Sequence, residues 1–455
     1  MAGSVFDSQI YGDLFTSGDV GRLFTDTAEA RAMLLVEGAL ARAQGAAGVI
    51  PQDSAAAIGR AVMEVAMDPG TLRRPTGQNG VPVPGLVAAF RTEMNAPEHA
   101  QYVHWGATSQ DIMDSALMLR LRQALALIED DLKLALEALA KLAQTHASLP
   151  MAARTYGQHA TPTSFGAVVA TWGMPLLALI DELAELRRNC LLVSLSGAAG
   201  TSGALGPKAG EIRAEMAKAL GLNDPEASWH TDRTSVLRLM DWMVRVNLAL
   251  GKLGEDCIAL VQTGIGEISL GGAGASSTMP QKQNPVAPSA LVALARQGTG
   301  LLSILHGSAL HQHQRDGAAW FSEWLCLPQI VLGAASAART ARDLCTAITP
   351  NADAMSTALS SGLDMIHAET LSFALAAEMP RPDAQAVVKT LCREAGVSGT
   401  PLRALVGRDF PQLDVEALFD PVAQLGAAPT EALRFSKKVA ELASNQNESQ
   451  DGAHA

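Results

Sequence analysis

Apolar side chains recur at intervals of three and four residues over several unusually long parts of the chain. The longest part runs from Ile112 to Ser148, contains neither glycine nor proline, and is closed by Pro150. As a helix it would extend for about 55 Å, at about 1.5 Å per residue. The positions that define its apolar stripe are Leu117, Leu121, Leu125, Ile128, Leu132, Leu136, Leu139 and Leu142. Alanines widen this stripe, which predicts a helix buried in a multi-helix bundle.

Four further stretches have the same apolar, alanine-rich character. They span residues 162–188, 234–263, 285–306 and 318–348. Thr231 or Asp232 is suited to cap the second of these stretches, and Pro285 fits the first turn of the third. Pro175 and Pro328 lie inside the first and the last, where we expect bends. The pattern predicts an all-α subunit whose five long helices form a bundle that several subunits complete.

Shorter helical patterns flank the bundle on both sides. Residues 25–45 indicate one helix, and residues 76–84 (TGQNGVPVP) indicate a loop. After Pro350 the apolar runs shorten again, so we predict a three-domain subunit with a polar tail. Its parts are an N-terminal helical domain at 1–103, a central long-helix bundle at 104–348, a small helical C-terminal domain at 349–444 and a disordered tail at 445–455.

The composition limits the partners of the chain. Hydrophobic residues make up 48% of the 455 positions and aromatic residues only 4%, which favours closely packed helices over a β-sandwich or barrel. Lys and Arg number 34 against 46 Asp and Glu, which gives a net charge of −12. Such a chain is not expected to bind nucleic acid or an anionic membrane surface. A small anionic substrate is still compatible, because it needs only a few local cations.

No basic leader and no run of roughly 20 unbroken apolar residues is present, so we expect a cytoplasmic protein without a spanning helix. The five cysteines are scattered and include no C-x-x-C pair, which indicates free thiols in a reducing compartment. The sequence also lacks an H-E-x-x-H motif, and we expect no zinc site.

Four polar clusters interrupt the helical pattern. They are HWGATSQD at 104–111, ARTYGQHATPTSFG at 153–166, GIGEISLGGAGASSTMPQKQNP at 264–285 and HQHQRDGAAWFSEW at 311–324. In the first cluster, Thr108, Ser109 and Gln110 lie beside the free N–H groups of a helix start, which suits a bound anion. The alternative for these residues is a helix cap and nothing more. The second cluster gathers Arg154 and His159 among other polar groups, and a single His before a helix is more often structural than catalytic.

The third cluster is the most informative. Five glycines fall between Gly264 and Gly274 and predict a mobile lid. Ser276, Lys282 and Asn284 follow, without the Gly-Lys-Ser/Thr of a phosphate loop.

In the fourth cluster, Arg315 could bind a carboxylate bidentately, or it could form a surface salt-bridge cluster with Asp316 and Glu323. Its two histidines are two positions apart and do not share a helix face, which disfavours a metal pair.

The segment SSTMPQKQNP resembles the signature of the fumarase/aspartase superfamily, G-S-S-x-M-P-x-K-x-N-P, with Ala275 in place of the leading glycine. The first and second clusters, and GAAGT at 197–201, are similar to other motif regions of that superfamily in the expected order. This resemblance implies an all-α homotetramer with a twenty-helix core and active sites built from segments of three subunits. It also implies a small polycarboxylate substrate and no metal or organic cofactor.

The same resemblance implies roles for individual residues. Ser276 would be the acid/base group, Lys282 would hold and stabilise a substrate carboxylate, and His159 is a further catalytic candidate. The substrate-binding positions implied are Thr108, Ser109, Gln110, Arg154, Tyr156, Gln158, Ser277, Met279, Asn284 and Arg315.

Within the superfamily the chain resembles the 3-carboxy-cis,cis-muconate cycloisomerases. Its opening YGDLFTSGDVGRLFTD and the segment HQRDGAAWFSEWLCLPQ are similar to theirs, and the Thr-His pair of adenylosuccinate lyases is replaced by Thr155–Tyr156. A lactonising enzyme can lack that His, because the attacking carboxylate has a pKa near 4 and is already ionised. His159 could still substitute for it. The alternatives are an adenylosuccinate- or argininosuccinate-type lyase that releases fumarate, a sulfomuconate cycloisomerase, and a binding protein that reuses the fold.

Overall fold

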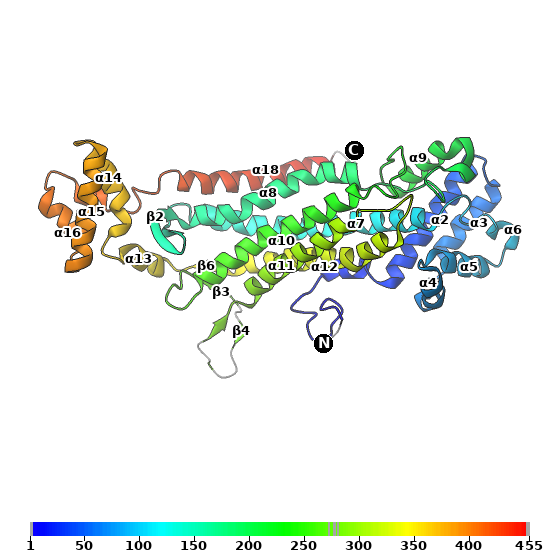
Figure 1. The fold of residues 1–455 in the computed structure, drawn as a ribbon, viewed down its shortest axis with the longest axis horizontal. Helices are drawn as coiled ribbons and strands as arrows, with labels where there is room; N and C mark the ends of the chain where they lie inside the picture. Colours follow the sequence, from blue (N-terminus) through cyan, green and yellow to red (C-terminus); the bar gives the residue numbers. More distant parts are fainter. Residues whose placement is uncertain (1–2, 272–273, 276–278, 280–281, 452–455) are drawn as a thin grey trace. The chain divides into compact units, whose positions relative to one another are not determined.

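The structure, a computed structural model, describes residues 3–271, 274–275, 279 and 282–451. Helices dominate this part of the chain, and its longest strand has seven residues (Figure 1). The prediction of an all-α fold is confirmed.

Five long helices occupy the stretches that the apolar pattern predicts. They are α7 (Ser109–Thr145), α8 (Phe165–Cys190), α10 (Thr234–Leu260), α11 (Val286–Gly307) and α12 (Gly317–Ala347). Asp232 caps α10, because its Oδ1 accepts a hydrogen bond from the Thr234 N–H at 3.0 Å. Pro175 and Pro328 each lie within a continuous helix.

The described chain forms two compact units, and every long helix contributes residues to both. The first unit contains residues 1–131, 179–248 and 293–340. Besides the bundle segments it holds α1 (Gly18–Leu23), α2 (Asp26–Ala46), α3 (Gln52–Glu64), η1 (Pro69–Leu72), α4 (Arg73–Asn79), α5 (Val83–Met94), α6 (Pro97–Ala100), η2 (Gly203–Lys208) and α9 (Ala209–Leu220). Helix α2 packs against α3 and α9 (Figure 1).

The prediction of a loop at 76–84 is wrong at both ends, where the residues belong to helices. Its first residues complete α4, which ends at the left-handed Gly80, and its last residues begin α5. Proline at the first turn of α5 supplies the backbone angle that a helix start needs. Proline therefore begins a helix here instead of marking a loop.

The second unit contains residues 132–178, 249–292 and 341–455. Its elements outside the bundle are β1 (Pro150–Thr155), β2 (Gln158–Ser164), β3 (Ile268–Leu270), β4 (Gly274–Ala275), β5 (Gln283–Asn284), β6 (Ile348–Pro350), α13 (Ala352–Ser360), η3 (Met365–His367), α14 (Ala368–Ala376), α15 (Arg381–Ser398), α16 (Leu402–Asp409), α17 (Val415–Leu418) and α18 (Ala428–Asp451). Strands pair antiparallel as β1–β2, β3–β6 and β4–β5. Helices α14, α15 and α16 surround an apolar core of their own (Figure 1). The three-domain division of the chain stays a prediction.

Helix α18 differs from the expected C-terminal pattern of short helices and a disordered tail. It has 24 residues and continues to Asp451, so the tail prediction is wrong for 445–451. Helix α18 packs closely on α8, where Gly173 faces Phe435. A Cβ atom at Gly173 would lie 2.1 Å from the Phe435 ring, so only glycine allows this approach.

Helix α8 bears on the expectation that the chain has no membrane-spanning helix. By length and composition alone it would be long and apolar enough, although half of its most apolar window is buried inside the protein, as in a core helix. The five cysteines are free thiols, as predicted, and burial raises the pKa of Cys257 to about 12.

Candidate active site

The start of α7 is fixed by one buried carboxylate. Both oxygens of Asp111 accept hydrogen bonds, from the backbone N–H groups of Thr108 (3.0 Å), Ser196 (2.8 Å) and Gly197 (2.9 Å). His230 Nε2 lies 2.8 Å from the same carboxylate. Thr108 and Asp111 stand in the positions of a capping box, in which a side chain in the first turn bonds the capping residue. The predicted anion-binding residues Thr108 and Ser109 therefore sit on a rigid helix start.

Gln110 connects this helix start to Arg315. The Gln110 side chain is fully buried, and its Nε2 donates to Asp114 at 3.1 Å and to the His230 carbonyl at 2.8 Å. Its Oε1 accepts a 2.7 Å hydrogen bond from Arg315 Nε. The amide of Gln110 is thus fully engaged within the protein. Arg315 Nη2 is buried without a hydrogen-bond partner, which leaves part of the guanidinium fork available for an anion.

A neutral imidazole lies beside this guanidinium. His311 Nδ1 accepts a hydrogen bond from the Asp316 N–H at 3.3 Å, and its Nε2 is buried without a partner. Burial lowers the pKa of His311, and the nearby charges of Arg233 and Arg315 lower it further. His311 is therefore uncharged at neutral pH.

Next to Gln110 lies an ionic cluster that the sequence analysis did not predict. Arg233 donates to both oxygens of Asp114, at 2.8 and 3.0 Å, and to both oxygens of Glu323, at 2.9 and 2.7 Å. All three side chains are almost fully buried. Burial raises the pKa of Glu323, against the opposing charge of Arg233. The surface salt-bridge alternative is therefore wrong for Glu323, which belongs to the interior.

The second cluster of polar residues forms a tight hairpin in the second unit. Its two-residue turn, Tyr156–Gly157, has positive φ at both positions (52° and 72°), as in the turns that suit β-hairpins. Tyr156 is fully exposed at the tip. Gln158 and His159 are also exposed, and His159 pairs in register with Arg154 across the two strands.

Arg154 is held by a residue that the sequence analysis did not single out. Its guanidinium donates to both oxygens of Glu267, at 2.7 and 2.9 Å, and the Glu267 carboxylate is fully buried. Glu267 immediately precedes β3 at the base of the glycine-rich segment. The bidentate pair therefore joins the hairpin to that segment. Glu267 takes two of the five guanidinium N–H donors, so Arg154 keeps others with which to contact a substrate carboxylate.

Part of the glycine-rich signature lies within the described residues. Gly274 pairs with Asn284, and Lys282 donates its backbone N–H to the Met279 carbonyl at 2.9 Å. Lys282 is exposed, as is Met279. Ser276 and Ser277 lie outside the described residues. Over the described part of the chain, no group of three or more His, Cys, Asp or Glu side chains is placed to hold a metal ion.

Comparison with known proteins decides the family. The sequence model of the lyase family matches residues 19–300. The chain belongs to this family. The predicted resemblance to the fumarase/aspartase superfamily and its 3-carboxy-cis,cis-muconate cycloisomerases is confirmed.

Several members of this lyase family are similar over nearly their whole length. The 3-carboxy-cis,cis-muconate cycloisomerase of Pseudomonas aeruginosa is 36% identical over 92% of this chain and 94% of its own. The nitrosuccinate lyase of Streptomyces davaonensis is 35% identical over 94% of each chain. The crystal structure of 3-carboxy-cis,cis-muconate lactonizing enzyme from Pseudomonas putida superimposes with a TM-score of 0.89 at 34% identity, and covers 95% of this chain and 99% of that one.

Proposed function

We propose that the chain is a 3-carboxy-cis,cis-muconate cycloisomerase, which acts in the breakdown of protocatechuate. The observation that carries this proposal is the 36% identity to two such enzymes from Pseudomonas, each over at least 90% of both chains. The substrate is then a small tricarboxylate with two conjugated double bonds. We further propose a cytoplasmic homotetramer whose active sites combine segments of different subunits.

The reaction forms one C–O bond and one C–H bond. A carboxylate of the substrate adds to one end of a double bond, and the neighbouring carbon, which lies α to another carboxylate, accepts a proton. Negative charge builds up on that second carboxylate before the proton arrives. Fixed cations and amides that stabilise this charge supply most of the acceleration. We assign this role to Lys282 and Asn284.

The described geometry supports a binding role for the first unit. Thr108 and Ser109 lie on a helix start that Asp111 makes rigid, and Arg315 is held at Nε by Gln110 while its Nη2 has no partner. Two such preformed anion contacts suit a trianionic substrate in a chain of net charge −12. Gln110 then acts by positioning Arg315.

The attacking carboxylate is already ionised and needs no base, so the reaction requires only one group that delivers a proton to carbon. We propose that Ser276 is this proton donor. Ser276→Ala is expected to lower kcat by about two orders of magnitude or more, as when a general acid is lost. Tyr156→Phe serves as the matched control, and it is expected to change kcat far less, because no second proton transfer is required. Steady-state kinetics of both variants, with size-exclusion chromatography to check assembly, make the comparison. A loss in Tyr156→Phe equal to that in Ser276→Ala would contradict the single-donor mechanism.

The proposed activity is measured directly by the loss of ultraviolet absorbance of 3-carboxymuconate, because lactonisation removes part of its conjugation. After the purified protein is added, the absorbance is expected to fall at a rate proportional to the protein concentration. An unchanged spectrum would reject the proposal.

A second candidate is a lyase that releases fumarate from a substituted succinate. The 35% identity to a nitrosuccinate lyase, over 94% of each chain, favours it. The test is the rise of fumarate absorbance with nitrosuccinate, adenylosuccinate or argininosuccinate as substrate. Fumarate release without any lactonisation would establish this candidate in place of the cycloisomerase.

A further inference from the structure

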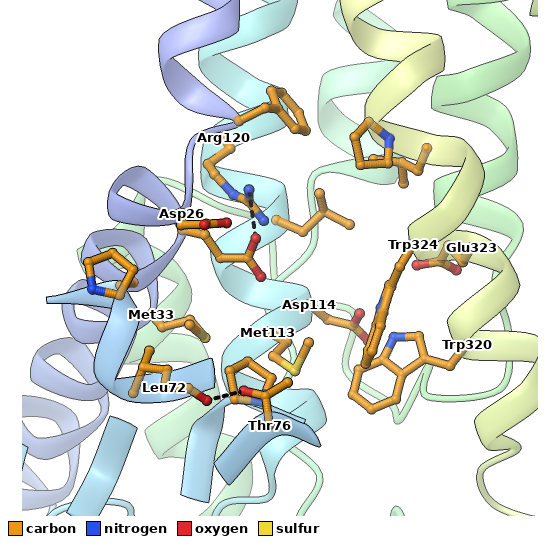
Figure 2. Close-up of a pocket in the computed structure, with 18 of the residues that line it drawn as sticks. Asp26, Met33, Leu72, Thr76, Met113, Asp114, Arg120, Trp320, Glu323 and Trp324 are labelled. Carbon is orange, nitrogen blue, oxygen red and sulfur yellow. Dashed lines mark hydrogen bonds and ion pairs between the residues drawn. The ribbon is translucent and has the colours of Figure 1, made fainter. Parts of the chain in front are cut away.

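A cavity of about 550 Å³ lies within the first unit, between α2, the η1–α4 segment, α7 and α12 (Figure 2). Its wall is mainly apolar. The apolar side chains that line it include Met33, Leu72, Met113, Leu117, Trp320 and Trp324. A cavity of about 150 Å³ already accommodates benzene. This one has room for a flat ligand larger than a single ring, with the broad side of Trp324 facing it (Figure 2).

One buried cation on the wall, Arg120, is only partly paired. Arg120 is 8% exposed, and its guanidinium makes a single ion pair, with Glu29 at 3.4 Å. Its Cζ atom lies 5.2 Å from the centre of the Phe24 ring, which offers a cation–π contact but no hydrogen-bond acceptor of its own. Arg120 Nε is buried and has no hydrogen-bond partner. Burial lowers the pKa of Arg120, so a further anion beside it would be stabilising.

Besides Glu29, which pairs with Arg120, the wall carries three further carboxylates among the described residues. Asp114 and Glu323 are each bonded at both oxygens by Arg233, which lies behind them. Asp26 is exposed to water. The buried polar atom of the wall that lacks a partner is therefore a donor and not an acceptor. This asymmetry favours an anion at Arg120, although the faces of the aromatic rings by themselves attract cations.

We propose that this cavity binds a small carboxylic acid with a flat apolar body, whose carboxylate pairs with Arg120. The planar guanidinium offers Nε and an Nη in the geometry that a carboxylate accepts. The apolar body would lie against Trp320, Trp324 and Leu117.

The test compares three probes of nearly equal shape by isothermal titration calorimetry of the full-length protein. Cinnamate carries the carboxylate, cinnamamide is its neutral counterpart, and cinnamylamine is a cation. Cinnamate is expected to bind at least tenfold more tightly than either of the others. A hydrogen bond to a charged group contributes at least this much, because a tenfold change in Kd corresponds to only about 1.4 kcal/mol. Tighter binding of the amine, or no binding of cinnamate at millimolar concentration, overturns the proposal. Binding is measured without turnover, so the outcome does not depend on the proposed reaction.

Variants locate the site. Arg120→Met is expected to weaken cinnamate at least tenfold and to leave cinnamamide within threefold of its original affinity. Arg122→Met, two residues along α7, removes a guanidinium that bonds the Leu220 and Gly221 carbonyls and should not affect either probe. If Arg120→Met fails to fold, Leu117→Trp fills the cavity instead and should abolish binding of both. Unchanged cinnamate binding in either cavity variant overturns the proposal.

Discussion

At the scale of single residues, Arg233 joins two buried carboxylates in the polar interior of the first unit. It is the shared partner of these carboxylates, which would otherwise carry unpaired charge in the protein interior. An unpaired buried charge costs several kcal/mol, whereas a solvated surface pair contributes little.

Arg233→Met is therefore expected to destabilise the folded protein by about 3–5 kcal/mol, because Asp114 and Glu323 lose their counter-charge. Arg238→Met is the control: its pair with Glu185 is exposed, and its loss should cost about 1 kcal/mol or less. Urea unfolding at equal subunit concentration measures both. Adding Asp114→Asn and Glu323→Gln to Arg233→Met should recover much of the loss, and no recovery would argue against charge as the cause.

His104 gives the first unit a pH-dependent contribution to stability. Its Nδ1 lies 2.7 Å from the buried carboxylate of Glu37. Burial lowers the pKa of His104, but the hydrogen bond and the charge of Glu37 outweigh burial, and the pKa is raised above its ordinary value. The stabilisation is therefore fully present below that ordinary value, and it is lost as pH rises through the pKa of the folded state.

We expect the stability difference between the natural protein and the double variant His104→Asn/Glu37→Gln to shrink as pH rises from about 5.5 to about 8.5. The double variant removes both titrating groups, and Asn tolerates the positive φ of 64° at position 104. Urea unfolding across this range makes the measurement. A difference that grows with pH would show that the imidazolium does not stabilise the fold.

The site shows how far single residues can be predicted from the sequence. Motif residues such as Thr108, Lys282 and Arg315 can be named, because their short-range pattern is distinctive. The buried ion pairs beside them cannot be predicted, since Arg233 and Asp114 are 119 positions apart and only the fold brings them together. A local signal did exist for Asp111, which stands three residues after Thr108 as in a capping box.

At the scale of elements, the long helices were predictable to within a few residues because their apolar, alanine-rich stripes are continuous, although only α7 is free of glycine. The hairpin β1–β2 was not, because its turn places Tyr156 in a left-handed conformation that few tyrosines adopt. Helix α18 was also missed beyond residue 444, since a polar run without an apolar stripe resembles a tail.

The contact between α8 and α18 gives a test at this scale. Gly173→Ala is expected to destabilise the protein by about 1–3 kcal/mol, because the new methyl group overlaps the Phe435 ring. Gly396→Ala is the control: it lies within α15 with no atom near its Cβ position, and it should be neutral or stabilising by up to about 1 kcal/mol.

Chemical denaturation measures both glycine variants, at equal subunit concentration. Combining Gly173→Ala with Phe435→Leu should restore part of the loss, because the smaller side chain makes room for the methyl group. Equal effects of the two alanine substitutions would mean that helix propensity, and not this contact, sets the outcome.

At the scale of the whole molecule, the proposed tetramer explains why predicted site residues fall in both compact units. Thr108 and Arg315 belong to the first unit, and His159 and Lys282 belong to the second. The superfamily resemblance implies that a complete site combines such segments from different subunits.

Hybrid tetramers test this sharing. Arg315→Ala and Lys282→Ala are each expected to be nearly inactive alone, because each removes a cation that we propose binds the substrate. Co-expressed, they should regain measurable activity, since some sites in mixed tetramers receive both natural residues. Mixing the separately folded variants without subunit exchange is the control. If hybrids of confirmed mixed composition were inactive, Arg315 and Lys282 of each active site would come from the same subunit.

The bidentate pair between Arg154 and Glu267 has a consequence for the construction of chimeras. A loop exchanged between relatives to alter substrate preference would be cut near position 264, and it would carry a new residue into position 267. If the exchanged segment came from a relative without Asp or Glu at that position, the guanidinium of Arg154 in the hairpin would lose its bidentate partner. The hairpin and the glycine-rich segment should therefore be transplanted together, as one inherited block.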